Sequence, residues 1–147
     1  MATQKIGGFP SLDKELSFPM YACSKELIKL YTPYLEDLDL TYTQYLTMML
    51  LWDEKQATVK TLGEELYLNS ATMTPILKKL ESKGYLTRTR MKSDERNVLI
   101  TITREGEALK SRAAGISDAV MDSLQLEENE AKVLFILMYK ILHKITE

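Results

Sequence analysis

Hydroxyl and ammonium side chains are interleaved with apolar ones between positions 70 and 83 of this 147-residue chain. Met73, Leu77 and Leu80 recur at spacings of four and three, which places them on one face of a helix. The side chains left facing outward are Thr72, Thr74, Lys78 and Lys79. Short hydroxyls suit base edges and ammonium groups neutralise phosphates, so this face suits a nucleic acid.

A second basic group follows in the sequence. Arg88 and Arg90 lie two positions apart within residues 85–90, which predicts a strand. Residues 98–102 predict a second strand, and residues 92–97 predict the turn between the two. Arg96 would then lie at a hairpin tip, where an arginine suits the narrow and strongly negative minor groove of DNA.

The distribution of charge supports this interpretation better than the total charge. The chain has a formal net charge of −2, yet residues 70–104 contain eight basic and three acidic residues, so that segment carries +5 and the remainder −7. A local cationic face favours phosphate contact because phosphate neutralisation releases counterions. The competing interpretation is a solvated charged helix face; we favour nucleic acid because the charges coincide with a reading motif.

The elements that must position these side chains form a recognisable order. Thr58 is placed to cap a helix with Val59, Leu62 and Leu66 on its apolar side, and residues 66–70 break that helix and restart it. The second helix runs from about Ser70 to Lys83, and Gly84 would end it in the left-handed conformation. A helix, a turn, a helix and a two-stranded hairpin constitute a winged helix-turn-helix, here residues 42–103.

Apolar helical patterns flank this reading region. They occur in residues 12–36 and in residues 104–147, where apolar spacings of three and four predict two helices, one over residues 109–124 and one over residues 134–145. Together these patterns exceed what one small domain needs to bury. We expect a single domain of mainly α structure with a small β-hairpin wing (α+β), in which the flanking helices form a homodimer. The alternative is that these helices form intrachain core. Residues 1–11, with two adjacent glycines, are expected to be a mobile arm.

Several functional classes are disfavoured by the composition. No apolar stretch is long enough to span a membrane and no signal region is evident, so we expect a cytoplasmic protein. One cysteine, Cys23, and one histidine, His143, exclude a disulfide within the chain and give no basis for a metal site. There is no glycine-rich phosphate loop and no nucleophile elbow, so we expect neither an enzyme nor a cofactor.

Three segments together resemble the MarR family of bacterial transcriptional regulators, and most of all its OhrR group. They are residues 40–45 (LTYTQY), 68–80 (LNSATMTPILKKL) and 94–98 (DERNV). The resemblance implies a homodimeric repressor that binds an inverted-repeat duplex. It further implies that Ser70, Thr72 and Thr74 approach bases, and that Arg96 enters the minor groove, oriented by Asp94. A local ion pair between Asp94 and Arg96 that closes the turn is the alternative.

The chain departs from the OhrR pattern at the sensor. In that group a cysteine of the first helix is hydrogen-bonded by two tyrosines of the partner subunit, and organic peroxide oxidises it. Tyr21 and Tyr31 fit the tyrosine positions, but Ser17 occupies the cysteine position, and a hydroxyl cannot form a sulfenic acid or a disulfide. Two hypotheses remain: Ser17 is native in a regulator that senses something else, or it is a deliberate replacement that mimics the reduced state. Pro19 favours the first, unless it lies in the first helical turn.

Cys23 cannot simply replace the missing thiol, because six helical residues turn it to another side than Ser17. We expect it to be a small buried packing residue, with a redox role as the alternative. Residues 48–52 (MMLLW) would line an effector pocket if a small-molecule ligand, and not thiol oxidation, releases the DNA. A winged helix that binds RNA or another protein is a further alternative, disfavoured by the hydroxyl and lysine face and by Arg96.

Overall fold

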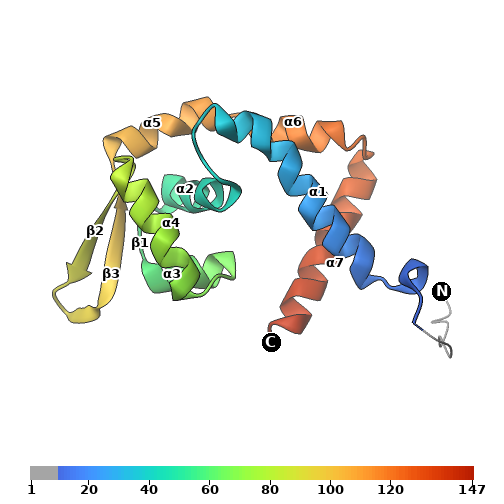
Figure 1. Ribbon diagram of the computed structural model, residues 1–147, viewed down its shortest axis with the longest axis horizontal. Helices are drawn as coiled ribbons and strands as arrows, with labels where there is room; N and C mark the ends of the chain where they lie inside the picture. The colour runs from blue at the N-terminus through green and yellow to red at the C-terminus, as the bar shows by residue number, and fades with distance from the viewer. Residues whose placement is uncertain (1–9) are drawn as a thin grey trace.

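The structure, a computed structural model, describes residues 10–147, with the side chain of Glu95 left out. It is mostly helical, with one small antiparallel sheet, which confirms the predicted fold class (Figure 1). In chain order the elements are a 3-10 turn (Leu12–Lys14), α1 (Ser17–Glu36), α2 (Tyr42–Glu54), β1 (Gln56–Thr58), α3 (Val59–Leu66), α4 (Ser70–Ser82), β2 (Leu86–Met91), β3 (Asp94–Ile102), α5 (Arg104–Ala113), α6 (Ile116–Ser123) and α7 (Glu128–Ile145). The predicted mobile arm, residues 1–11, lies outside the described residues except for its last two positions.

The helices of the reading lobe, by which we mean residues 42–102, begin at side-chain caps. The hydroxyl of Thr58 accepts the Thr61 N–H at 3.1 Å, which confirms the predicted start of α3. Asn69 caps α4 by accepting the Thr72 N–H at 2.8 Å. Gly84 follows α4 with φ 83°, the left-handed conformation that the sequence predicts for the residue ending this helix.

The turn between α3 and α4 is tight because of a glycine. A Cβ at Gly63 would lie 2.6 Å from the carbonyl oxygen of Leu68, so only glycine lets the chain return this closely over α3. Beneath the turn lies the core of the lobe. Its fully buried apolar side chains come from α2, α3, α4 and both long strands: Met48, Leu51, Leu62, Met73, Leu77, Leu80, Leu86 and Ile100. The predicted apolar stripe of α4 therefore faces the core.

The sheet differs from the predicted hairpin in two ways. It has three strands in the order β1-β3-β2, and the three-residue β1 was not predicted; it pairs with β3 through Ala57 opposite Ile100. The second wing strand begins at Asp94 and not at Val98, so the turn is shorter than predicted, and a bulge interrupts the ladder at Arg90 and Met91. The prediction of the turn was wrong because residues 94–97 carry no apolar alternation that would indicate a strand.

The C-terminal region contains three helices where the sequence predicted two. The apolar spacing of residues 109–124 indicated one helix, but Gly115 adopts φ 83° and separates α5 from α6. A left-handed residue cannot continue a right-handed helix, so the chain turns there.

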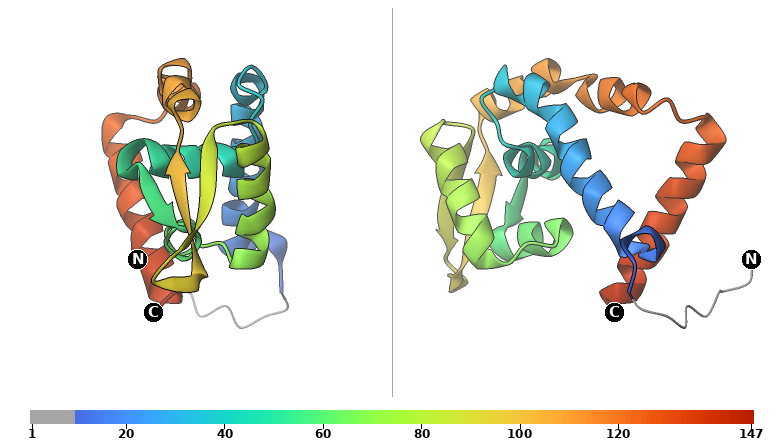
Figure 2. Two further views of the ribbon diagram at one scale, coloured as in Figure 1. Left: turned by 90° about the vertical axis from the view of Figure 1, so that its left-hand side faces the viewer. Right: turned by 45° about the vertical axis from the view of Figure 1, so that its right-hand side comes forward.

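The elements form an arch (Figures 1 and 2). The reading lobe stands at one side, α5 and α6 bridge the top, and α7 descends at the other side. Helix α1 overlaps α7 in Figure 1 but lies apart from it in the left view of Figure 2. No residue of α7 is buried, and the seven consecutive large apolar residues from Val133 to Tyr139 are exposed. None of the helices in residues 10–147 is long and apolar enough to cross a membrane.

Candidate nucleic-acid interface

The capped N-terminus of α4 and the wing enclose a surface groove of about 700 Å³. Ser70 and Thr74 line it from α4, and Arg88 and Arg96 line it from β2 and β3. The structure thus brings together four of the predicted contact residues, which come from segments 14 or more positions apart. Lys60 of α3 and Tyr67 of the turn also line the groove, and neither was predicted from the sequence as a contact residue.

The hydroxyl groups of α4 are not equivalent. Ser70 and Thr72 are exposed. Thr74, predicted to point outward, is half-buried, and its hydroxyl donates to the carbonyl oxygen of Ser70 at 2.8 Å. Its oxygen can still accept a hydrogen bond, but Ser70 and Thr72 are the hydroxyls that a base edge can reach freely.

The lysines of the predicted face also differ in their surroundings. Lys78 and Lys79 are exposed on α4 beyond the groove. Lys83 is different: its side chain is only 17% exposed, and its Nζ lies 3.3 Å from Oδ2 of Asp39. The charge count of the sequence included Lys83 in the cationic face, but its ammonium group is held by the segment between α1 and α2.

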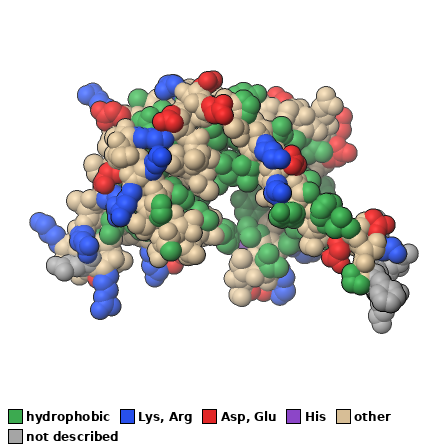
Figure 3. Space-filling model, in the orientation of Figure 1, with side chains coloured by type: hydrophobic (Ala, Val, Ile, Leu, Met, Phe, Trp, Pro, Cys, Tyr) green, Lys and Arg blue, Asp and Glu red, His purple; other side chains and the backbone are tan. Residues whose placement is uncertain are grey.

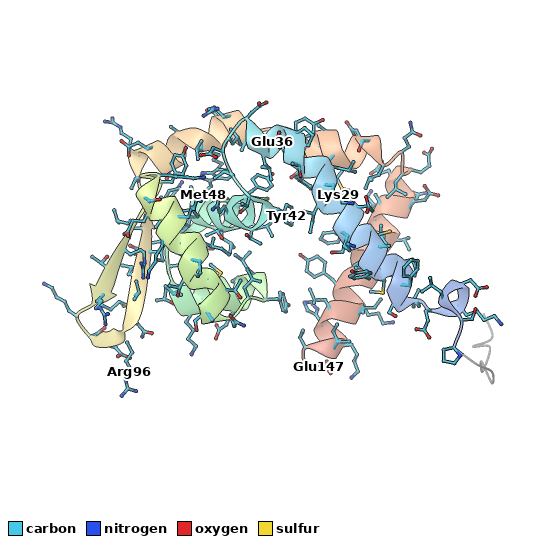
Figure 4. The ribbon with its side chains drawn as sticks, viewed as in Figure 1. Lys29, Glu36, Tyr42, Met48, Arg96 and Glu147 are labelled. Carbon is cyan, nitrogen blue, oxygen red and sulfur yellow. The ribbon has the colours of Figure 1, made fainter. Side chains whose placement is uncertain are left out.

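The tip of the wing is ordered by Asp94. Its Oδ1 accepts the backbone N–H of Arg96 at 3.0 Å, and its Oδ2 accepts a hydrogen bond from Nδ2 of Asn97 at 3.4 Å. The Arg96 side chain extends from the tip away from the rest of the protein (Figure 4). Asp94 thus orients the backbone that carries Arg96, and the guanidinium group points outward.

Two further arginines lie along β2. Arg88 is half-buried, and its Nε is buried without a hydrogen-bond partner among the described residues. Arg90 is exposed nearer the tip. Lys and Arg side chains gather over the wing and α4, whereas apolar side chains dominate α1 and the hollow beside it (Figure 3). The local cationic face expected from the sequence is therefore present.

The predicted sensor residues lie on α1. Ser17 is exposed at the first position of the helix, and Pro19 falls within the first turn, where its missing N–H removes no helical hydrogen bond. Tyr21 is 60% exposed, whereas Tyr31 is buried. Positions 17 and 31 are about 21 Å apart along α1, so Ser17 and Tyr31 of one chain do not meet.

Tyr31 instead belongs to an aromatic cluster of its own chain. Its ring lies 5.1 Å from that of Tyr42 and 6.0 Å from that of Tyr45, between centroids. Burial raises the pKa of Tyr42, and the neighbouring Tyr31 and Tyr45 raise it further, so this phenol stays neutral. Tyr42 lies at the end of α2 that points toward α1 (Figure 4).

Cys23 is exposed in the chain, which contradicts the prediction that it is a buried packing residue. The prediction failed because it assumed that a neighbouring helix covers this side of α1. Among the described residues, no group of three or more His, Cys, Asp or Glu could hold a metal ion.

A capped second helix, a tight glycine-dependent turn and a basic hairpin beside it define a winged helix-turn-helix, the architecture of many transcription regulators. The chain belongs to the SarA/Rot family of transcriptional regulators, whose profile matches residues 29–113. It is 48% identical to the HTH-type transcriptional regulator SarZ of Staphylococcus aureus (strain MRSA252) over 120 residues, which cover 82% of this chain and 81% of SarZ.

Solved structures show the same architecture with DNA bound. Reduced AbfR bound to DNA has a TM-score of 0.74 and 33% identity, over 92% of this chain and 95% of that one. A mutant MarR from E. coli, complexed with operator DNA, has a TM-score of 0.79 and 25% identity, over 86% of this chain and 93% of MarR. The protein is therefore a MarR-like winged-helix transcription regulator, similar in architecture to proteins whose structures contain DNA.

Proposed function

We propose that this regulator is a homodimeric repressor that recognises an inverted-repeat duplex. The observation that carries the proposal is the groove in which Ser70 and Thr74 of α4 face Arg88 and Arg96 of the wing. A helix N-terminus with free hydroxyls suits the major groove, while an arginine at a hairpin tip suits the adjacent minor groove.

Each predicted contact residue then has a distinct role. Ser70 and Thr72 approach base edges, with Thr74 as an acceptor beside them. Lys78 and Lys79 neutralise phosphates beyond the groove, and Arg88 and Arg90 do so along β2. Arg96 enters the minor groove, with Asp94 holding its backbone.

The dimer is supported by the uncovered helices. A helix that is hydrophobic on all sides is normally buried, and α7 is apolar and exposed over seven consecutive residues. Helix α1 also has exposed apolar side chains, among them Phe18 and Ile28. A second copy with two-fold symmetry would cover both helices and present two recognition helices to half-sites about one DNA turn apart.

We further propose that DNA release does not depend on a thiol at position 17. Structures of AbfR of Staphylococcus epidermidis include an overoxidized form bound to DNA and a disulfide form. Ser17 offers no sulfur for such chemistry, so this chain is peroxide-insensitive there, either natively or as a mimic of the reduced state. A link to organic-peroxide stress thus rests on resemblance to the OhrR group.

The second candidate mechanism is release by a small-molecule ligand. A pocket of about 270 Å³ lies between α2 and α5 and is lined by Tyr45, Met49, Trp52 and Lys110. A ligand there would contact both the reading lobe and the helix that leads to α6 and α7.

A selection from random duplexes, followed by anisotropy titrations, tests the proposed function. We expect selected sites to be inverted repeats, bound with an affinity that falls steeply with salt, by a species of twice the chain mass in sedimentation. Equal affinity for selected and scrambled duplexes would show that binding is not sequence-specific. Preference for RNA, or a monomer bound to one half-site, would exclude the dimeric repressor.

A further inference from the structure

Two short segments connect the reading lobe to the helices that we assign to the dimer. Residues 37–41 join α1 to α2, and residues 114–115 join α5 to α6. Both lie at the top of the arch (Figures 1 and 2). Because α5 is fixed to the reading lobe by the buried hydrogen bond from Trp52 to Gly106, any rotation of the lobe relative to α1 and α7 must change these two segments.

Lys83 connects the end of α4, the recognition helix, to the segment of residues 37–41. It is the residue directly after α4, and its Nζ donates to the carbonyl oxygen of Asp39 while also pairing with the Asp39 carboxylate. Asp39 has φ 53°, so the segment is held in a conformation that few side chains favour. The neighbouring Leu38 and Leu40 are buried in the core, which anchors the segment on either side of this contact.

Arg112 connects the segment of residues 114–115 to the segment of residues 37–41. It lies in the last turn of α5, and its Nη2 donates to the carbonyl oxygen of Asp37 at 2.8 Å. A pocket of about 400 Å³, lined by Tyr34, Arg112 and Gly115, lies at this junction. The two segments are therefore not fully packed together. The Arg112 hydrogen bond lies beside this pocket, which leaves space for one segment to shift relative to the other.

We propose that Lys83 and Arg112 are positioning residues that set the separation of the two recognition helices, and thereby the spacing of half-sites that the dimer accepts. The inference rests on the proposed homodimer. A rotation of about 10° moves a point about 20 Å away, the length of α4, by about 3.5 Å. That displacement is about one base-pair step of 3.4 Å, so a small change at the segments alters the preferred spacing.

The role of Lys83 is distinguishable from phosphate contact. An exposed lysine that binds a phosphate contributes about one unit to the salt dependence of binding. Lys83 is mostly covered and paired with Asp39, so its loss leaves the salt slope unchanged and alters geometry instead. Lys78, five residues earlier, within α4 and exposed, is the matched control for charge.

The first test measures the distance between recognition helices without DNA. A spin label is attached at Ala71→Cys, an exposed position of α4, in a Cys23→Ser background, and pulsed electron resonance records the distance between protomers. We expect Lys83→Met and Arg112→Met to broaden the distribution or shift its mean by about 3 Å, about one base-pair step. Lys83→Arg, which retains the contact, and Lys78→Met should match the parent.

The second test uses selected operators whose half-sites are moved apart or together by one or two base pairs. The parent protein should have one sharp optimum, and Lys83→Met should flatten or shift it at an unchanged salt slope. Lys78→Met should weaken all spacings equally and reduce the slope by about one. Unchanged distances and spacing profiles in both variants, or a reduced slope for Lys83→Met, would overturn the inference alone. If the spin-labelled parent gives no measurable distance between protomers, the proposed dimer and the inference are both wrong.

Discussion

Trp52 in α2 donates a buried hydrogen bond of 2.9 Å from its indole Nε1 to the backbone carbonyl of Gly106, in the first turn of α5. The close approach needs glycine, because a Cβ at position 106 would lie 2.2 Å from the carbonyl oxygen of Tyr85. The hydroxyl of Thr103 caps the same turn by accepting the Gly106 N–H at 3.1 Å. The start of α5 is thereby fixed to both α2 and the chain that enters the wing.

We predict that Trp52→Phe lowers the free energy of unfolding by about 1–3 kcal/mol, because it removes a buried hydrogen bond and part of the buried indole ring. Gly106→Ala should cost at least as much, since its clash is with backbone that cannot rotate away. Urea denaturation followed by far-UV circular dichroism measures both, because the single tryptophan is lost in the first variant. Ala108→Ser, at an exposed position of α5, is the control and should change stability by less than about 0.5 kcal/mol.

For the wing, we predict that Arg96→Ala weakens binding to the selected operator by about 1–3 kcal/mol, because the guanidinium contact in the groove is lost. Asp94→Ala should weaken binding less, since it only loosens the backbone at Arg96. Anisotropy titrations at several salt concentrations separate these effects from those of Lys78→Ala, which should weaken every duplex similarly. Parent-like affinity of Arg96→Ala would show that the wing stays outside the groove.

The reading lobe was largely predictable because its signals are local. Thr58 as a cap, the apolar stripe of α4 and Gly84 as its end each depend on residues within one or two helical turns, and the structure confirms all three. The strand β1 was missed because three residues give no readable alternation. The partial burial of Thr74 was missed because the wing that flanks it is distant in sequence.

The flanking region was predicted less well because its geometry depends on tertiary contacts. The break at Gly115 has the same apolar spacing on both sides, so periodicity alone indicated one helix. Lys83 was counted as a DNA-facing cation, but the position of Asp39 relative to α4 is set by the fold and leaves no pattern in the sequence. Cys23 was expected to be buried for a similar reason: its exposure depends on whether another helix covers that side of α1, and none of residues 10–147 does so.

If α7 is a dimer helix, a charge in its apolar surface should dissociate the protein. Ile136 is 64% exposed in the single chain. Ile136→Glu would place an unpaired carboxylate in the interface at a cost of about 3–5 kcal/mol. We expect sedimentation velocity to show a monomer with unchanged helical content and weakened operator binding. Lys132→Glu, an exposed position of the same helix, is the control and should stay dimeric; a dimeric Ile136→Glu would place the interface elsewhere.

The last prediction concerns the missing thiol. Cumene hydroperoxide should leave operator binding of the parent protein unchanged, because the hydroxyl of Ser17 cannot be oxidised as a thiolate is. Ser17→Cys should make binding sensitive to peroxide, since α1 is regular from its first residue and Pro19 does not distort it. The exposed phenol of Tyr21 from a second chain would then favour the thiolate. Anisotropy before and after oxidation, with mass spectrometry of position 17, gives the readout. Cys23→Ser is the essential control, because Cys23 is a thiol exposed in the single chain. Loss of binding in the parent that Cys23→Ser abolishes would make Cys23 the sensor and refute the assignment of this chain as peroxide-insensitive.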